Sequence, residues 1–496
     1  MRNIKITAFY AVIFIICLSF SACSQNDTNI NSDRDRNNES DRFPADIDEK
    51  DSVLDSIPAA ELYYDILGER DFEGAVFTIL DANDHPDFHK NISESMNGDP
   101  LNDALYLRDR FIEEKYGVDI KYIQITKASN GCAALEKSVL AGENPYDLVV
   151  SPVLGGSLAR ISTQNILYNM TDAPYLSLTS PWWSKLFYEN MQFNNRLYYN
   201  GGDIFLPSYA QGPAMMAFNK KLFKDRGIQE NLYEMAFEGK WTFDVLERLI
   251  KDTNVDLNQD GRMTAEHDFF GMIHVNHSLH IGFFFAAAGM KYSESTGESI
   301  NINLKSDIYT NKIERLKNML DSVSDDHMKA FATFKSDRAL FIAHSMDCPQ
   351  VHLRDMESDF GILPMPKWDE KQETYVSFMN AWVSGFVAIP QNADIEKSAF
   401  ITEAMAYAGY ETFRKPVYET TLKTKIARDE ESERIIDIIL ETVYMDLNAI
   451  YNFGGTYDIV RNAIMDNKPF VSEYEKQENA MNNDIAKFIE ATLKVD

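Results

Sequence analysis

The sequence predicts an α/β fold in which helices cover a parallel sheet, and three observations indicate it. Apolar strand patterns and helical patterns alternate at short intervals between residues 75 and 150, which is the order that builds βαβ units. The chain has 496 residues, of which 45% are hydrophobic, so it can bury large cores and form more than one domain. After residue 23, no apolar run approaches the length of a membrane-spanning helix.

The first elements follow from their periodicity. Residues 75–80 (AVFTIL) have the pattern of a buried strand, and residues 101–116 have a helical pattern that Gly117 closes. A second strand at 118–125, a second helix at 132–141 and a third strand at 146–150 are expected next. Ligands bind beyond the carboxyl ends of parallel strands, so loops 81–86 and 151–156 are expected to reach the binding site.

The N-terminus predicts export from the cell. Arg2 and Lys5 precede an almost unbroken apolar run at residues 8–20, which is short for a membrane span and typical of a signal peptide, here residues 1–22. The end of this run, FSAC at 20–23, resembles the lipobox of bacterial lipoproteins, although Phe20 stands where leucine is commoner. That resemblance implies that Cys23 becomes the lipidated first residue. The alternative is an ordinary signal peptide followed by a chance cysteine.

Residues 23–71 are predicted to be the lipidated cysteine and a disordered tether. Residues 24–60 are rich in Asn, Asp, Ser, Arg and Glu, with Phe43 as their only aromatic residue, so they cannot bury enough surface to fold. A coil of this length would hold the folded part about 30 Å from the membrane. The expected location is therefore the extracytoplasmic face of the cell membrane, with membrane contact through the lipid anchor only.

Charge and cysteine content limit the partners further. The formal net charge of -29 argues against nucleic acid as a partner. Of the four cysteines, Cys17 would leave with the signal peptide and Cys23 would carry lipid. Cys132 and Cys348 would either form a disulfide or remain as two buried thiols, and the sequence contains no CxxC pair.

A series of motifs resembles family 1 of the extracellular solute-binding proteins, the substrate-capturing lipoproteins of carbohydrate ABC importers. The motifs are YDLVV at 146–150, LYNMTD at 167–172, PWWSK at 181–185, LYYNGGD at 197–203, MAFNKKLF at 216–223, GKWTFDVL at 239–246, FGILPMPK at 360–367 and GFVAIP at 385–390. Their order and spacing carry the resemblance, which runs from about residue 72 to the C-terminus.

The resemblance implies a two-lobe periplasmic-binding-protein-like (type II) fold with a ligand cleft between lobes that close by hinge motion. Lobe 1 would comprise residues 72–208 and 372–412, and lobe 2 residues 209–371 and 413–496. The implied function is capture of a sugar or oligosaccharide and its delivery to the permease subunits of an ABC importer. The resemblance also implies a monomer without catalytic activity.

A sugar site needs flat rings for the apolar C–H face of a pyranose and short polar side chains for its hydroxyl edge. Trp382 is the first candidate ring, because it lies in the segment 377–384, just ahead of the returning strand, where the resemblance implies a loop at the cleft. Trp183 and Phe453 are further candidate rings. The candidates for the rest of the cleft are Asn83, Asp84, Ser151, Asp203, Gln211, His274, Asn276 and Met346.

The segment DLNQDGR at 256–262 resembles the start of a calcium-binding loop. Asp256, Asn258, Asp260 and Arg262 stand at positions 1, 3, 5 and 7 of that pattern, and Asp268 would complete a displaced site because His267 stands at position 12. Such calcium would be structural, and no other cofactor is expected. The alternative is a polar turn held by Asx hydrogen bonds.

Common enzyme motifs are absent from the sequence. It contains no HExxH, GxSxG, P-loop or GxGxxG pattern. The paired carboxylates of a glycosidase need no fixed spacing, so a lipid-anchored glycoside hydrolase is one alternative function. Two others keep the fold, namely a binder of a peptide, a polyamine or another non-sugar solute, and a sensor subunit.

Overall fold

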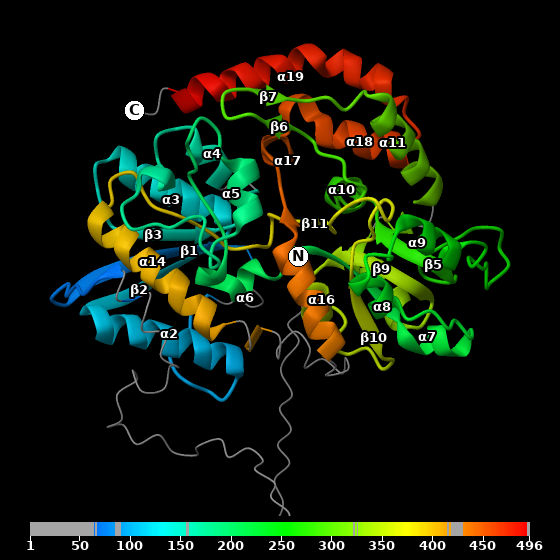
Figure 1. Ribbon diagram of the computed structural model, residues 1–496, viewed down its shortest axis with the longest axis horizontal. Coiled ribbons are helices and arrows are strands. Elements are labelled where there is room, and N and C mark those ends of the chain that lie inside the picture. Colours follow the sequence, from blue (N-terminus) through cyan, green and yellow to red (C-terminus); the bar gives the residue numbers. More distant parts are fainter. Residues whose placement is uncertain are drawn as a thin grey trace, which may run out of the picture. The chain divides into compact units, whose positions relative to one another are not determined.

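The computed structural model describes residues 64, 67–84, 91–154, 158–320, 323–324, 326–413, 416–417 and 430–493 (Figure 1). These residues belong to one compact unit, Ser52–Asp496. The signal peptide, Cys23 and most of the tether lie outside the described residues, so the interpretations placed there stay predictions. Within the described part, no helix combines the length and the apolar content that a membrane span needs.

The first sheet has four strands in the order β12-β3-β1-β2. β1 (Ala75–Asn83) runs parallel to both β2 (Val118–Thr126) and β3 (Leu148–Ser151). The predicted parallel arrangement is therefore confirmed for these three strands. The late strand β12 (Phe386–Ala388) adds an antiparallel edge beside β3, so residues near position 387 return to the sheet begun at position 75.

Helix α2 (Pro100–Tyr116) begins and ends where the sequence predicted. Asp99 is its N-cap, since its carboxylate accepts hydrogen bonds from the backbone N–H groups of Leu101 and Asn102. Gly117 ends the helix in the left-handed region, with φ of 60°. Both signals are local, which explains why the pattern was readable from the sequence.

Several predicted boundaries near this sheet were wrong: β3 begins at Leu148 rather than at residue 146, and β1 and α3 differ more. β1 continues through Asn83 instead of ending before a loop at residue 81, because buried Asp81 accepts hydrogen bonds from Asn91 (2.9 Å) and Gln124 (3.0 Å). α3 (Ala128–Leu140) begins four residues before Cys132. The Asp84 carboxylate accepts the Ala128 N–H at 3.3 Å and supports that earlier start.

The second sheet has five strands in the order β10-β4-β9-β5-β8 and is mixed. β4 is antiparallel to both β9 and β10, whereas β5 is parallel to β9 and β8. The strands are β4 (Ala214–Asn219), β5 (Phe270–Val275), β8 (Val323–Ser324), β9 (Ala339–Ser345) and β10 (Phe360–Pro364). Helices of this region are α7 (Lys220–Asp225), α8 (Leu232–Phe237), α9 (Phe243–Ile250), α10 (Ser278–Ala287), α11 (Asp307–Met319), α12 (His327–Lys335) and α13 (Cys348–Val351).

The remaining elements connect or cover the sheets (Figure 1). α14 (Ile395–Thr412) packs against α2, and α16 (Glu430–Glu441) packs against α8 and β10. The others are α4 (Leu158–Ser162), η2 (Met170–Asp172), α5 (Lys185–Met191), η3 (Asp203–Phe205), α6 (Leu206–Tyr209), β6 (Glu294–Ser295), β7 (Ile300–Asn301), β11 (Ser377–Phe378), β13 (Val443–Tyr444), α17 (Leu447–Tyr451), η4 (Phe453–Gly455), α18 (Thr456–Met465) and α19 (Phe470–Leu493). The exact lobe boundaries stay predictions.

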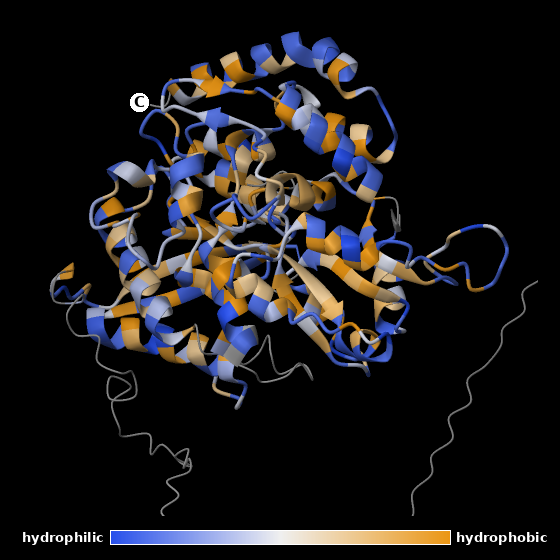
Figure 2. Cartoon of the chain, turned by 45° about the vertical axis from the view of Figure 1, so that its right-hand side comes forward, coloured by the Kyte–Doolittle hydropathy of each residue, from blue (hydrophilic) through white to orange (hydrophobic). Residues whose placement is uncertain are grey.

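Apolar residues gather on the strands and on the inward stripes of the helices, and polar residues lie on the outer helix faces (Figure 2). Cys132 and Cys348 are both buried free cysteines, so the second of the two cysteine alternatives is confirmed. Burial raises the pKa of the Cys132 thiol to about 11. A thiol with so high a pKa is unreactive at neutral pH.

Candidate functional site

Two cavities meet at the segment between β11 and β12. The first is narrow, leaves no room for a water molecule, and is lined by Asn83, Ser151 and Ser208 among others. The second has a volume of about 420 Å³, shares Val383 with the first, and is called the Trp382 cavity below. Its lining residues are His277, Leu279, His327, Met328, Phe331, His344, Asp347, Val351, His352, Asn380, Trp382 and Val383.

The segment that carries Trp382 is held in place by Asn380, which bonds both to the backbone of Trp382 and to the end of β9. Asn380 Oδ1 accepts the Trp382 backbone N–H at 3.2 Å, and Asn380 Nδ2 donates to Ser345 Oγ at 3.3 Å. The Trp382 side chain is 46% exposed, and it is the one aromatic residue among the exposed large hydrophobic residues that the structure describes. A fixed backbone thus places a partly exposed indole among the residues that line the cavity.

Histidines surround the inner part of this cavity. Five of the nine histidines of the chain gather here, contributed by the start of α10, by α12, by the end of β9 and by the residue after α13. The ring of His280 lies 4.8 Å from that of His344 and 4.9 Å from that of His327, measured between centroids. The ring of His352 stacks on Phe331 at 3.9 Å.

Packing of the rings against one another and against the cavity wall keeps the imidazoles of His280 and His327 neutral. Burial, and then the neighbouring ring of His344, lowers the pKa of His327 to about 4 and that of His280 well below its ordinary value. His344 Nδ1 lies 3.3 Å from the carboxylate of Asp347. Burial opposes ionisation of Asp347, but the hydrogen bonds from His344 and Ser345 outweigh it and lower the pKa of that carboxyl group. Asp347 is therefore an anion that orients His344.

The other two predicted rings are buried in the core. Trp183 is 3% exposed, and its indole N–H donates to Glu403 of α14 at 2.9 Å. Phe453 is also 3% exposed; its face stacks on Tyr451 and its edge region meets Phe488. Neither ring lines the Trp382 cavity.

Three predicted residues lie on the chain that leads into β4 or out of β9. Asp203 is buried at the start of η3, where its backbone N–H donates to the Trp182 carbonyl at 2.9 Å. The Gln211 carbonyl accepts the backbone N–H of Asp347, and the N–H of Met346 donates to Pro213, both at 2.9 Å. Gln211 and Met346 thus support the backbone of Asp347 from behind the cavity wall.

The remaining predicted residues have structural contacts. His274 is fully buried within β5, and Asn276 accepts two hydrogen bonds from Arg461. Asp84 supports the start of α3, as described above. Of the predicted ligand-binding residues, the structure brings Trp382 to the larger cavity and Asn83 and Ser151 to the adjoining narrow one.

The acidic segment forms a loop held by its own carboxylates. Asp256 accepts the Gly261 N–H at 2.8 Å, and Asp260 accepts the Arg262 N–H at 2.8 Å. Asn258 Oδ1 in turn accepts the N–H of Asp260, and buried Asp268 accepts the N–H groups of Leu257 and Thr264. These are the hydrogen bonds of a polar turn; calcium binding at this loop stays a prediction.

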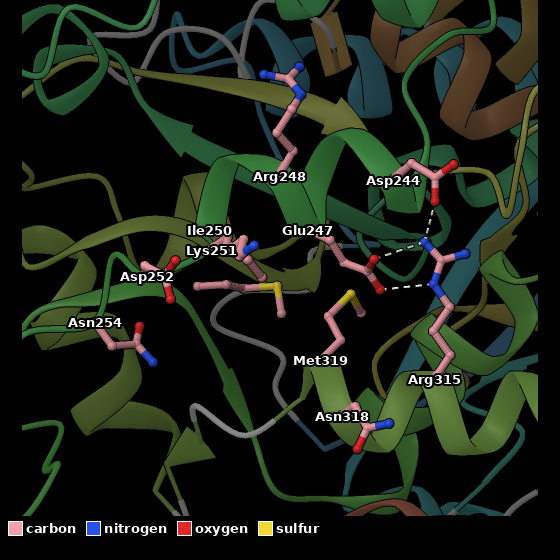
Figure 3. A pocket seen from close by; sticks show the side chains of 11 residues that line it. Asp244, Glu247, Arg248, Ile250, Lys251, Asp252, Asn254, Arg315, Asn318 and Met319 are labelled. Atoms are coloured by element: carbon pink, nitrogen blue, oxygen red, sulfur yellow. Dashed lines mark hydrogen bonds and ion pairs between the residues drawn. The ribbon is translucent and has the colours of Figure 1, made fainter.

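A larger groove lies elsewhere, between α9 and α11, with a volume of about 880 Å³ (Figure 3). Figure 3 shows Arg315 pointing toward Asp244 and Glu247, to which it donates at 2.5 Å and at 2.9 to 3.0 Å. The groove contains no aromatic side chain. Because its central cation already has two carboxylate partners, the groove has less to offer a neutral solute than the Trp382 cavity.

Most of the polar cavity lining was not predicted from the sequence. The motifs did not single out His277, His327, His344, Asp347 or Asn380, which all line the Trp382 cavity. The signal available was weak: nine histidines in a chain of 496 residues, with several between positions 274 and 352. Histidine spacing across separate strands and helices says nothing about proximity before the fold is known.

The chain matches a known protein family. Residues 101–407 match the model of the family described as bacterial extracellular solute-binding protein. No curated protein matches the chain. The family is non-catalytic and serves ABC transport, so the glycoside hydrolase alternative is excluded.

Solved structures resemble the fold over most of its length. A cyclo/maltodextrin-binding protein complexed with maltotetraose matches with a TM-score of 0.54 and 14% identity, over 86% of this chain and 98% of that one. An ABC substrate-binding protein from Listeria monocytogenes in complex with cycloalternan has a TM-score of 0.53 and 10% identity, over 83% and 99%. The GacH receptor of Streptomyces glaucescens, solved unliganded and with acarbose, matches with a TM-score of 0.50 and 10% identity. The match covers 85% of this chain and 100% of that one. At these identities, the structural similarity shows the type of fold alone. The family match covers more than half of the chain, so this chain belongs to the bacterial extracellular solute-binding proteins.

Proposed function

We propose that this solute-binding protein captures a sugar or oligosaccharide in the Trp382 cavity and delivers it to the permease subunits of an ABC importer. The observation that carries the proposal is the half-exposed indole of Trp382 beside a cavity of about 420 Å³. Ligand pockets typically measure about 300 to 1,000 Å³. An open indole face is a surface on which the C–H face of a pyranose can stack.

The polar lining suits the hydroxyl edge of a sugar. Asn380 and Asp347 offer an amide and a carboxylate, and neutral imidazoles offer both a donor and an acceptor. The three solved structures described above carry maltotetraose, cycloalternan and acarbose. Their folds and ligands support a saccharide as the solute of this chain.

The adjoining narrow cavity fits a cleft that opens and closes. Asn83 and Ser151 lie at the carboxyl ends of β1 and β3, and only Val383 is common to the two cavities. In the proposed mechanism, hinge motion between lobe 1 (72–208 and 372–412) and lobe 2 (209–371 and 413–496) opens this narrow space to the solute. Binding then selects the closed form, which the permease recognises.

A thermal-shift screen of the purified protein tests the proposal. Maltotetraose, acarbose and a panel of mono- and oligosaccharides are added separately, each with calcium and with a chelator. A ligand at 100 times its Kd stabilises the folded state by about 2.7 kcal/mol. We expect one family of oligosaccharides to raise the melting temperature. A rise with calcium in the absence of sugar would support structural calcium at Asp256, Asn258, Asp260, Arg262 and Asp268.

Matched variants locate the bound sugar. Trp382→Ala should melt at nearly the wild-type temperature without ligand, because its side chain is half exposed, and should lose most of the sugar-dependent shift. Leu140→Ala removes an exposed apolar side chain that does not line the cavity and should keep the full shift. A shift with peptides or polyamines but with no sugar would overturn the sugar proposal and retain the fold.

Neighbouring permease genes would favour import, whereas a neighbouring histidine kinase gene would favour a sensor subunit.

We also propose that Cys23 carries the lipid anchor and that the protein acts as a monomer at the extracytoplasmic face of the membrane. The apolar run at 8–20 and the FSAC sequence that ends at Cys23 support this location. In the native host, Cys23→Ser should release the chain from the membrane fraction into the medium, as measured by immunoblotting. Retention of the variant in the membrane fraction would count against lipidation at this residue.

A further inference from the structure

Three histidines form a cluster at the inner side of the Trp382 cavity. His280, His327 and His344 each direct a ring nitrogen to one place, and these three nitrogens all lie within 4.8 Å of one another. The residues come from α10, α12 and β9, so three separate elements converge on the same point. Among the described residues, no other group of histidines, cysteines and carboxylates gathers in this way.

His280 supplies a second and independent observation. Its side chain is 1% exposed, and neither of its ring nitrogens has a hydrogen-bond partner among the described residues. A buried polar group without a hydrogen-bond partner costs free energy, so in native proteins such a group usually contacts a bound water or ion. The nitrogen that faces His327 and His344 is therefore positioned for a ligand.

The distance between the ring nitrogens of His327 and His344 suits an ion with tetrahedral coordination. Zinc binds imidazole nitrogen at about 2.0 to 2.1 Å, which at the tetrahedral angle separates two ligand nitrogens by about 3.3 to 3.4 Å. His327 Nδ1 and His344 Nε2 are 3.4 Å apart. Closing the widest separation in the cluster, 4.8 Å, to this value requires only side-chain adjustment of about 1.4 Å.

The surroundings of His344 also have the form expected of a metal ligand. Its Nδ1 faces the Asp347 carboxylate at 3.3 Å while its Nε2 faces the cluster. Ser345 donates a hydrogen bond to the same carboxylate at 2.8 Å and holds it in place. A carboxylate behind the outer nitrogen fixes the tautomer and orientation of a ligating histidine.

We propose that His280, His327 and His344 bind a divalent transition-metal ion of the zinc class and leave its fourth coordination position open toward the Trp382 cavity. His327 and His344 line that cavity, whereas His280 lies behind its wall. The open position would take water or a donor atom of the bound solute. Imidazoles favour zinc, copper and nickel over calcium, so this site is chemically distinct from the acidic loop.

Calorimetric titration of the purified, chelator-treated protein with zinc chloride tests the site. We expect saturable binding of one equivalent, with at least a tenfold loss of affinity in His327→Ala. His327 is exposed, so this variant should fold, and circular dichroism of the metal-free protein checks that it does. His267→Ala, an exposed histidine in the acidic loop, is the matched control and should retain full affinity.

A second set of measurements assigns the ligands. Cobalt added in place of zinc should give the strong visible absorption of a tetrahedral site, and His280→Gln should weaken or abolish it. His352→Ala should leave it intact, because His352 stacks on Phe331 outside the cluster. Absence of saturable zinc binding, or equal affinities in His327→Ala and wild type, would overturn the proposal. Because the metal alone is the probe, failure of the sugar screen has no bearing on this result.

Discussion

At the scale of single residues, the surroundings of a side chain decide whether it binds or supports. Trp382 and Trp183 are both tryptophans that the sequence offered as candidate rings. The first is half exposed at a cavity, whereas the second is buried with its N–H bonded to Glu403. Histidines show the same division, because four of them line the Trp382 cavity whereas His274 is enclosed in β5.

Burial of His274 predicts a measurable pH dependence of stability. Burial lowers its pKa from 6.5 to about 4, so between these values the unfolded chain binds more protons and stability falls as the pH falls. Relative to wild type, His274→Leu should gain about 2 kcal/mol of unfolding free energy between pH 7.5 and pH 5. Urea unfolding of both proteins at both pH values measures the difference in unfolding free energy between variant and wild type. A difference that is the same at pH 7.5 and pH 5 would contradict the prediction.

At the scale of elements, one carboxylate joins α14 to the segment before α5. Glu403 lies in α14, is fully buried, and accepts the indole N–H groups of Trp182 and Trp183 at 3.0 and 2.9 Å. Both indoles pack into the core, so their N–H groups have no access to solvent. This contact ties a late helix to an early loop of the first sheet region, and it explains why the PWWSK motif is structural.

Removal of this acceptor should destabilise the protein strongly. Glu403→Ala leaves two buried N–H donors without their present acceptor, which should cost about 2 to 5 kcal/mol of unfolding free energy. Glu403→Gln keeps one amide oxygen as an acceptor and should cost less than Glu403→Ala. Glu433→Ala, an exposed site on α16, is the control and should change stability by less than about 0.5 kcal/mol. Equal stability of Glu403→Ala and the control in urea unfolding would refute the assigned role.

At the scale of the whole molecule, the acidic charge sets the response to salt. The chain has 77 acidic and 48 basic side chains, a formal net charge of -29. Repulsion among these charges opposes the compact state, and salt screens it, shortening the Debye length from about 30 Å at 0.01 M to about 3 Å at 1 M. Raising NaCl over this range should therefore raise Tm by a few degrees. KCl should act equally, and a Tm that falls with both salts would show that local ion pairs outweigh the net repulsion.

Elements with local signals could be predicted from the sequence. The Asp99 cap and Gly117 define α2, and the apolar runs define the strands of the first sheet, because caps, turns and periodicity act over a few residues. The order of motifs was enough to identify the family. Trp382 could be proposed as a binding residue only through the family resemblance, which implies a loop at the cleft just before the returning strand.

Which side chains share a site depends on contacts between distant elements and could not be predicted from the sequence. Burial of Trp183 and Phe453 depends on Glu403 and Phe488, which are distant in the chain, so local sequence could not distinguish these rings from Trp382. The extension of β1 likewise depends on partners of Asp81 that come from other segments. The histidine cluster arises because α10, α12 and β9 converge on one cavity, and such convergence is a property of packing between elements rather than of spacing along the chain.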